Sequence, residues 1–167
     1  MQYKMHYKSP LGGMLLACDE KGLSGAWFDG QKYFAAGLDA NAVEYEHEHL
    51  VSAAGWLDIY FSGKNPDFMP QLNIRASEFR TIVWEALLKI PYGETRTYGE
   101  IAAAAAHRMG KEKMSAQAVG GAVGHNRLSV IVPCHRVLGA DGSLTGYAGG
   151  TDKKLALLRL ERVTAIA

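Results

Sequence analysis

The stretch TYGEIAAAAAHRMGKEKMSAQAVGGAVG, residues 97–124, predicts two helices joined by a basic turn. Thr97 and Glu100 have the spacing of a capping box, which satisfies free amide groups at a helix N-terminus. Ser115 is a favourable capping residue for a second helix over Ala116–Gly124. Two helices joined by a turn in a basic segment are typical of helix-turn-helix DNA-binding domains, although plain helical hairpins share the pattern.

The second predicted helix is unusual because nearly all of its side chains are small. A glycine inside a helix costs about 1 kcal/mol relative to alanine, so the adjacent pair Gly120 and Gly121 needs a reason. Close packing against another helix would explain the pair. A bare helix surface that approaches the minor groove of DNA would explain it equally well.

The N-terminal part of the chain predicts a small β-sheet and a helix. Three short apolar and aromatic stretches, separated by turn sequences, predict strands near residues 2–8, 13–19 and 24–29. From about Ala42 to Phe61 the apolar residues recur mostly at spacings of three, four or seven, which predicts a helix.

A boundary is expected between Pro66 and Pro70. Beyond it, Ser77 can cap a helix with an apolar stripe, and the two helices described above follow. The fold class is therefore an α/β domain with a small sheet and a helix over residues 1–69, followed by a mainly α, winged-helix-like helix-turn-helix domain over residues 70–167.

Charge is distributed unevenly between these two parts. Residues 1–69 contain five lysines, no arginine and nine acidic residues, whereas residues 70–167 contain thirteen basic and eight acidic residues. A basic part indicates a polyanionic partner, although chance variation of surface charge would look the same.

Two cysteines give no disulfide framework, and the first thirteen residues hold no apolar run. We therefore expect a cytoplasmic protein without a membrane partner.

The candidate reactive centre follows the second of these helices. The β-branched apolar run Ser129–Val132 predicts a buried strand that leads into PCHR, residues 133–136. A nearby histidine or cation favours the thiolate form of a cysteine, and His135 and Arg136 supply one of each. Strand neighbours point to opposite faces, so Pro133 must break the strand for Cys134 and His135 to act together. An isolated pair of this kind is usually structural, but here a glycine-rich loop that can wrap a ligand follows it at residues 141–150.

These residues resemble a known family. Asn126, the pentapeptide PCHRV at residues 133–137 and GYAGG at residues 146–150 resemble the signature of the O6-alkylguanine-DNA alkyltransferases, also called methylated-DNA–protein-cysteine methyltransferases. The resemblance covers nearly the whole chain and is strongest from Tyr92 to Glu161. It implies direct-reversal repair of double-stranded DNA by a single-turnover monomer without a cofactor, acting on O6-alkylguanine and also on O4-alkylthymine.

The resemblance also implies roles for individual residues. Cys134 would accept the alkyl group, and His135 would draw off its proton through a water molecule. Glu161 would hold and polarise His135. Asn126 would brace the turn before the reactive segment. Tyr98 would push on a backbone phosphate as the damaged base flips out of the duplex, and would hydrogen-bond the flipped guanine.

Further residues would bind the base and the DNA. The lesion pocket is expected to involve Val137, Tyr147, Ala148 and Ser129. The DNA-binding residues are expected to be Ala116, Gln117, Ala118, Gly120, Gly121 and Arg136.

The sequence departs from the family pattern at three positions. Gln117 stands where the family often has an arginine that fills the gap left by the flipped base. Glutamine brings no charge, so we expect weaker or more salt-tolerant binding. Arg127 replaces a proline, and Ser129 replaces a pocket-lining proline on which benzyl groups would pack.

Three other functions are alternatives for this sequence. A non-catalytic lesion sensor of the same fold would lack the cysteine. A helix-turn-helix transcription factor with a redox cysteine would need long polar side chains on its recognition helix, which offers only Gln117 and His125. A cysteine hydrolase would leave the basic helix pair unexplained.

The remaining candidate residues carry weaker signals. His47 and His49 are two residues apart on the predicted helix and should not share a face, so no metal site is expected. Cys18 lies in an apolar strand and is expected in the core, with no zinc ligands around it. Lys153 and Lys154 begin the last predicted helix. The sequence is compatible there with contact to DNA and with ordinary surface exposure.

Overall fold

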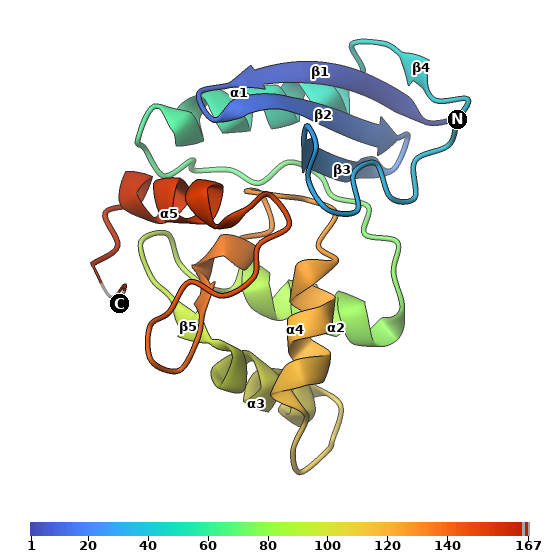
Figure 1. The fold of residues 1–167 in the computed structure, drawn as a ribbon. Helices are drawn as coiled ribbons and strands as arrows, with labels where there is room; N and C mark the ends of the chain where they lie inside the picture. The colour runs from blue at the N-terminus through green and yellow to red at the C-terminus, as the bar shows by residue number, and fades with distance from the viewer. Residues whose placement is uncertain (165, 167) are drawn as a thin grey trace. The chain divides into compact units, whose positions relative to one another are not determined.

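The computed structural model describes residues 1–164 and 166, which form two compact units. The first unit comprises Met1–Arg75 together with Arg127–Ile131, and the second comprises Ala76–Asn126 and the chain from Val132 onward. The expected division at residue 70 did not anticipate that the short segment Arg127–Ile131 belongs to the first unit. Figure 1 shows the course of the chain.

A four-stranded sheet forms the framework of the first unit. Its strands are β1 (Tyr3–Ser9), β2 (Gly12–Asp19), β3 (Gly22–Phe28) and β4 (Val43–Glu44), in the order β3-β2-β1-β4. β1, β2 and β3 form antiparallel hairpins, and the short β4 runs parallel to β1. The three strands expected from the sequence are confirmed to within two residues, because each one is bounded by a turn sequence.

Helix α1 (Glu48–Phe61) packs against the sheet of this unit (Figure 1). The residues that it buries are Leu50, Ala53, Trp56, Leu57 and Tyr60. Since alternate residues of a strand point to opposite faces, both faces of β2 are covered: Leu15, Ala17 and Trp27 pack with the loop residues Ala35 and Leu38.

The expected start of this helix near Ala42 was wrong. Residues 43 and 44 instead pair with β1, and His47 is the N-cap, its Nδ1 accepting a hydrogen bond from the His49 backbone amide at 3.2 Å. Because His47 lies outside the helix, its ring reaches that of His49 and the two stack at a centroid distance of 5.0 Å. The expectation that the two rings lie apart was therefore also wrong. Within the described residues, no group of three or more metal-ligating side chains occurs.

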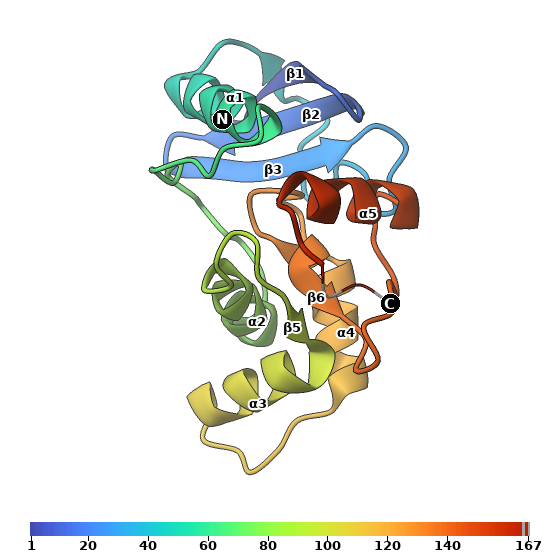
Figure 2. The same ribbon diagram turned by 90° about the vertical axis from the view of Figure 1, so that its left-hand side faces the viewer.

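The second unit is mainly helical. Its elements are α2 (Glu78–Leu88), β5 (Arg96–Thr97), α3 (Tyr98–Arg108), α4 (Ala116–Gly124), the 3-10 helix η1 (Cys134–Arg136), β6 (Val137–Leu138) and α5 (Thr151–Leu160). Helices α2, α3 and α4 pack against one another, and Trp84 Nε1 of α2 donates a 2.8 Å hydrogen bond to the carbonyl of Ala122 in α4. β5 and β6 pair in parallel beside them (Figure 2).

The predicted caps of these helices are confirmed. Ser77 and Ser115 cap α2 and α4. Thr97 and Glu100 form both halves of the capping box of α3, each with a 3.1 Å hydrogen bond. The fold class is confirmed: a small sheet with a helix, then a helix-turn-helix with a short two-stranded wing. No helix in the described part of the chain is long and apolar enough to cross a membrane.

Candidate active site and DNA-binding surface

The segment before the candidate nucleophile is a turn and not the expected strand. Ser129–Val132 forms no strand, although the Ser129 amide donates to the Ala26 carbonyl of β3 at 2.9 Å, and Val130 adopts a φ of 73°. A positive φ is rare for a β-branched residue, so burial of this apolar run takes precedence over its strand preference. Pro133 then precedes η1, which carries Cys134 and His135 on one tight turn. The expectation of a strand was wrong, but the chain does turn at Pro133 so that the two residues share a site.

Cys134 is buried, with only 4% of its surface exposed. Its sulfur receives a hydrogen bond from Asn126 Nδ2 at 3.1 Å, and the same amide group donates to the Val132 carbonyl at 2.8 Å. Burial raises the pKa of the Cys134 thiol to about 11, although the Asn126 hydrogen bond and the charge of Lys154 act in the opposite direction. The resting group is therefore a thiol, and it needs a base before it can attack.

His135 and Glu161 form a buried pair. His135 Nε2 lies 2.6 Å from Glu161 Oε2, and neither side chain is exposed. Burial lowers the pKa of His135 while the carboxylate raises it, and the net pKa is below its ordinary value. Burial alone would raise the pKa of Glu161, but His135 and Arg136 outweigh it and lower that pKa to about 2. The pair is thus a neutral imidazole oriented by an ionised carboxylate.

Arg136 does not lie on the surface, which corrects the expectation that it contacts DNA. It is only 7% exposed. Its Nε donates to Glu161 Oε1 at 2.8 Å, its Nη2 to Glu161 Oε2 at 3.2 Å, and its Nη1 to the Ile90 carbonyl at 2.8 Å. A buried arginine needs a paired acid, so Arg136 and His135 share the same carboxylate.

A shallow hollow of about 430 Å³, wide open to solvent, lies at the N-terminal ends of α3 and α4. The residues that line it are Tyr98, Ala116, Gln117, Gly120, Thr145 and Gly146. Four of these were expected at the base-binding or DNA-binding site, and the structure brings them together. The hydroxyl of Tyr98 donates a 3.0 Å hydrogen bond to the Thr145 carbonyl, which ties α3 to the glycine-rich loop.

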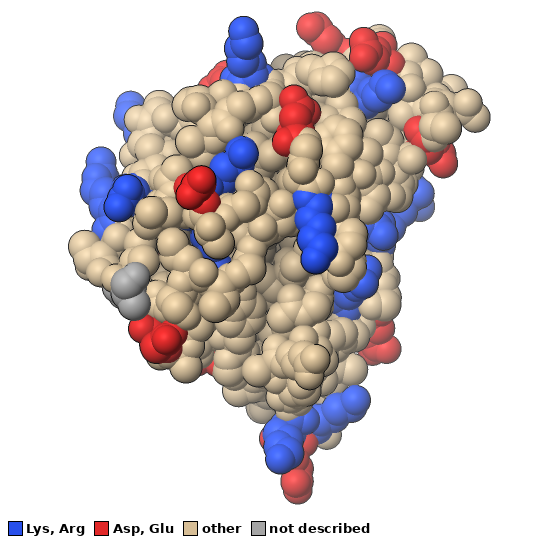
Figure 3. All heavy atoms as spheres, viewed as in Figure 1, with Lys and Arg blue, Asp and Glu red and all other residues tan. Residues whose placement is uncertain are grey.

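Helix α4 presents a bare surface. Ala116, Gln117, Ala118 and Gly121 are exposed, and Gly120 is half-buried. A Cβ atom added at Gly120 or Gly121 would meet no atom within 4 Å. Packing against another helix therefore does not explain the adjacent glycines. In Figure 3 the surface over α4 is largely free of Lys, Arg, Asp and Glu.

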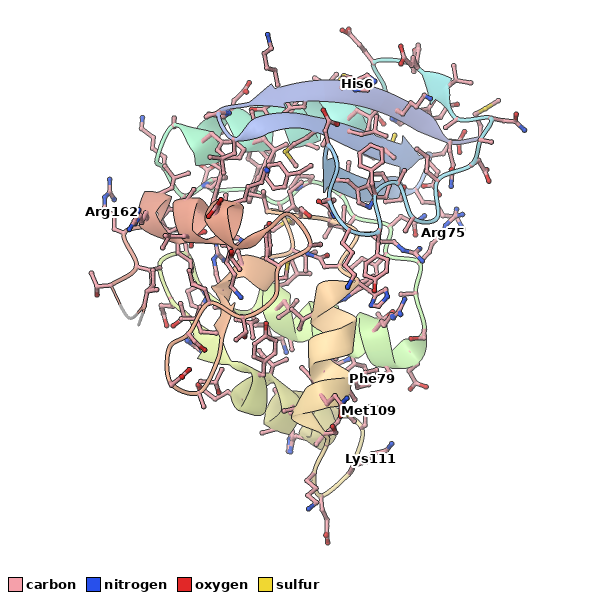
Figure 4. The ribbon with its side chains drawn as sticks, viewed as in Figure 1. His6, Arg75, Phe79, Met109, Lys111 and Arg162 are labelled. Atoms are coloured by element: carbon pink, nitrogen blue, oxygen red, sulfur yellow. The ribbon has the colours of Figure 1, made fainter. Side chains whose placement is uncertain are left out.

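The segment between α3 and α4 is exposed. Met109 ends α3, and Lys111 points away from the helices (Figure 4). The basic turn expected here is thus available to solvent.

The residues expected in the lesion pocket lie in different surroundings. Tyr147 and Ala148 are partly buried in the glycine-rich loop, and Val137 is buried in β6 with its amide donating to the Cys134 carbonyl. Ser129 is 1% exposed, and its hydroxyl donates to Gln31 Oε1 at 3.0 Å inside the first unit. A pocket-lining role for Ser129 is therefore corrected to an interior one.

Lys154 was not recognised from the sequence as a site residue. It is 0% exposed, and Nζ donates to the Thr145 carbonyl at 2.9 Å. One signal could have found it: Lys154 precedes Leu157 and Leu158 by three and four residues, which places it on the buried face of α5.

Comparison with known proteins gives one family for both units. A family described as 6-O-methylguanine DNA methyltransferase, DNA binding domain, matches residues 78–163, and its ribonuclease-like domain matches residues 2–74. The methylated-DNA–protein-cysteine methyltransferase of Methanosarcina acetivorans is 46% identical over 160 residues, which cover 95% of this chain and 97% of that protein.

Solved structures agree with this similarity. The crystal structure of the Mycobacterium tuberculosis O6-methylguanine methyltransferase superposes with a TM-score of 0.81 at 41% identity, covering 97% of this chain and 93% of that one. The crystal structure of Mycobacterium tuberculosis OGT in complex with DNA superposes with a TM-score of 0.78 at 40% identity, covering 96% and 92% of the two chains.

Proposed function

Because the chain belongs to the 6-O-methylguanine DNA methyltransferase family, we propose that it repairs alkylated double-stranded DNA by moving the alkyl group from O6-alkylguanine to Cys134. The observation that supports this most directly is the arrangement on η1. Cys134 and His135 share one turn, Asn126 binds the sulfur at 3.1 Å, and Glu161 binds the imidazole at 2.6 Å.

The transfer is a nucleophilic displacement at carbon. His135 takes the thiol proton through a water molecule, and Glu161 stabilises the imidazolium that forms. The sulfur of Cys134 then forms a bond to the alkyl carbon as the bond from that carbon to O6 breaks, and the guanine leaves with the electron pair. The hydroxyl of Tyr98, which donates to the Thr145 carbonyl when no base is bound, turns to the departing base and gives it a proton. The thioether product has no route back to a thiol, so each molecule acts once.

The duplex hides O6, so the base must leave the stack. The bare surface of α4, made of Ala116, Ala118, Gly120 and Gly121, enters the minor groove, and Gln117 takes the place of the flipped base. The open hollow beside Tyr98 receives that base, and we expect Tyr147, Ala148 and the backbone of Val137 to contact it. O4-alkylthymine is a further substrate, since it presents an alkyl group on an equivalent exocyclic oxygen.

The domain from residue 70 onward carries both DNA binding and alkyl acceptance, and residues 1–69 form the smaller α/β domain. The protein acts as a monomer in the cytoplasm and needs no cofactor, because the alkyl acceptor is its own side chain.

Intact-protein mass tests the proposal. The chain is mixed with excess duplex that contains one O6-methylguanine, beside the variants Cys134→Ala and Cys18→Ala. We expect the wild type and Cys18→Ala to gain one methyl group, mapped to the Cys134 peptide, and Cys134→Ala to gain none. An unchanged wild-type mass with preferential binding of the lesion duplex would instead identify a non-catalytic lesion sensor.

A further inference from the structure

Lys154 is a buried cation in the first turn of α5. Its surface is 0% exposed, and it forms no ion pair with an Asp or Glu among residues 1–164. A lysine this deeply buried is costly, and it is retained only where the ammonium group has strong partners. The proposed chemistry above does not use it.

The partners of Lys154 are backbone carbonyls of the glycine-rich loop. Its Nζ donates to the Thr145 carbonyl at 2.9 Å and lies 3.5 Å from the Gly146 carbonyl. The Tyr98 hydroxyl donates to the same Thr145 carbonyl at 3.0 Å, and Nζ lies 5.9 Å from the centre of the Tyr98 ring. One carbonyl therefore joins α3, α5 and the loop that carries Tyr147.

The titratable groups that face Lys154 belong to η1 and α3. They are Cys134 and His135 on η1, and Tyr98 on α3. The positive charge of Lys154 acts to lower the pKa of both Cys134 and His135. Burial in turn lowers the pKa of Lys154 to about 8, while Cys134 acts to raise it.

We propose that Lys154 is a positioning residue for alkyl transfer: its ammonium group locks the Thr145–Gly146 segment onto Tyr98 and supplies positive charge to the site of Cys134. The lock holds while Lys154 is charged, because a charged donor makes the stronger hydrogen bond. Loss of the proton as the pH rises through about 8 weakens it. This role in catalysis rests on the function proposed above, whereas the lock itself does not.

The lock is tested without DNA, by amide hydrogen exchange of residues 142–150 between pH 7 and 9. After correction for the intrinsic pH dependence, the wild type should exchange faster above pH 8. Lys154→Met should exchange at least about tenfold faster than the wild type at pH 7, with no remaining pH step, because it loses a charge-assisted hydrogen bond. Lys154→Arg keeps the charge and should retain part of the protection. Arg159→Met removes an exposed positive charge from the same helix and is the matched control.

The catalytic consequence is measured as methyl transfer from the O6-methylguanine duplex over the same pH range. Lys154→Met should transfer at least about tenfold more slowly at pH 7, and its rate should rise at higher pH than that of the wild type, since the thiolate has lost a stabilising charge. A purely structural role would not move the pH profile.

Each result decides between the two proposals. If Lys154→Met exchanges its amide hydrogens as slowly as the wild type and transfers methyl with the same pH profile, the role of Lys154 is overturned. If that variant fails to fold, absence of the pH step in the wild type overturns it equally. If the wild type accepts no methyl group from DNA, the proposed function fails, while the exchange experiment still shows whether the lock exists.

Discussion

The Nδ2 atom of Asn126 donates to two acceptors, the sulfur of Cys134 at 3.1 Å and the carbonyl of Val132 at 2.8 Å. One side chain thus both braces the turn before the reactive segment and stabilises negative charge on the sulfur. Asn126→Ala should remove both effects. We expect the free energy of unfolding to fall by about 1–3 kcal/mol, because a buried carbonyl loses its donor. Methyl transfer should also slow. Urea denaturation and a transfer assay measure the two effects, and an unchanged transfer rate would confine Asn126 to a structural role.

Glu161→Gln should slow methyl transfer by at least about tenfold, because the imidazolium of His135 loses its charged partner. DNA binding, measured by fluorescence anisotropy with the lesion duplex, should stay the same. The variant also leaves Arg136 buried beside a neutral amide, so its free energy of unfolding should fall by about 3–5 kcal/mol. Wild-type transfer kinetics in a folded Glu161→Gln protein would remove Glu161 from the mechanism.

Acid should destabilise the protein in a defined range of pH. Glu161 has a pKa of about 2 when folded and an ordinary value of 4.5, so the unfolded state binds more protons between these values. Its contribution, about 3 kcal/mol, is fully present above pH 4.5 and is lost as the pH falls toward 2. The lowered pKa of His135 acts in the same direction below pH 6.5, since only the unfolded chain then takes up the proton.

Urea denaturation from pH 3 to pH 8 measures this dependence. The wild type should lose stability continuously below pH 6.5. Glu161→Gln should show a shallower loss below pH 4.5, because a glutamine does not titrate. Equal slopes in the two proteins would show that Glu161 is not held ionised by its neighbours.

Gly121→Ala should separate stability from DNA binding. The position is exposed within α4 and has room for a Cβ atom, so the helix should gain about 1 kcal/mol. A methyl group on the surface that enters the minor groove should weaken DNA binding by at least about 1 kcal/mol. Gly55→Ala is the matched control, since Gly55 lies within α1 and also has room. It should stabilise the protein without changing affinity for DNA. Equal affinities of both variants would exclude close approach of α4 to DNA.

Gln117→Arg should strengthen DNA binding and steepen its dependence on salt. A cation that enters the duplex displaces condensed counterions, so the slope of log affinity against log salt should rise by up to about one. Gln117→Met, which keeps the length of the side chain without charge or hydrogen bonds, is the comparison. Anisotropy titrations at several salt concentrations measure both slopes. An unchanged slope in Gln117→Arg would show that residue 117 does not enter the duplex.

Local signals in the sequence were enough for much of the fold. The capping residues Ser77, Thr97 and Ser115 were predicted correctly, because a cap is a contact between residues two or three positions apart. The strands of the hairpins were equally predictable from the sequence, since turn sequences bound them. The break in the chain at Pro133 was also predictable, and it places Cys134 and His135 on one turn.

Properties that depend on distant partners were not predictable in this way. Arg136 was expected to contact DNA, and Lys154 either to contact DNA or to lie on an ordinary surface, whereas both are buried. Their burial depends on Glu161, 25 residues from Arg136 in the chain, and on the Thr145 carbonyl. Val130 shows the same limit for the backbone: its strand preference was overridden by a turn that buries it.

The burial of Cys134 bears on how long an unused molecule keeps its activity. A reagent that reacts once and is not regenerated loses its purpose if it meets an unrelated electrophile or oxidant first. Such agents attack exposed thiolates, and Cys134 is neither exposed nor ionised at rest. The raised pKa therefore protects Cys134 from alkylation and oxidation before it meets damaged DNA. The protein can keep its activity in the presence of the alkylating agents that make its substrate.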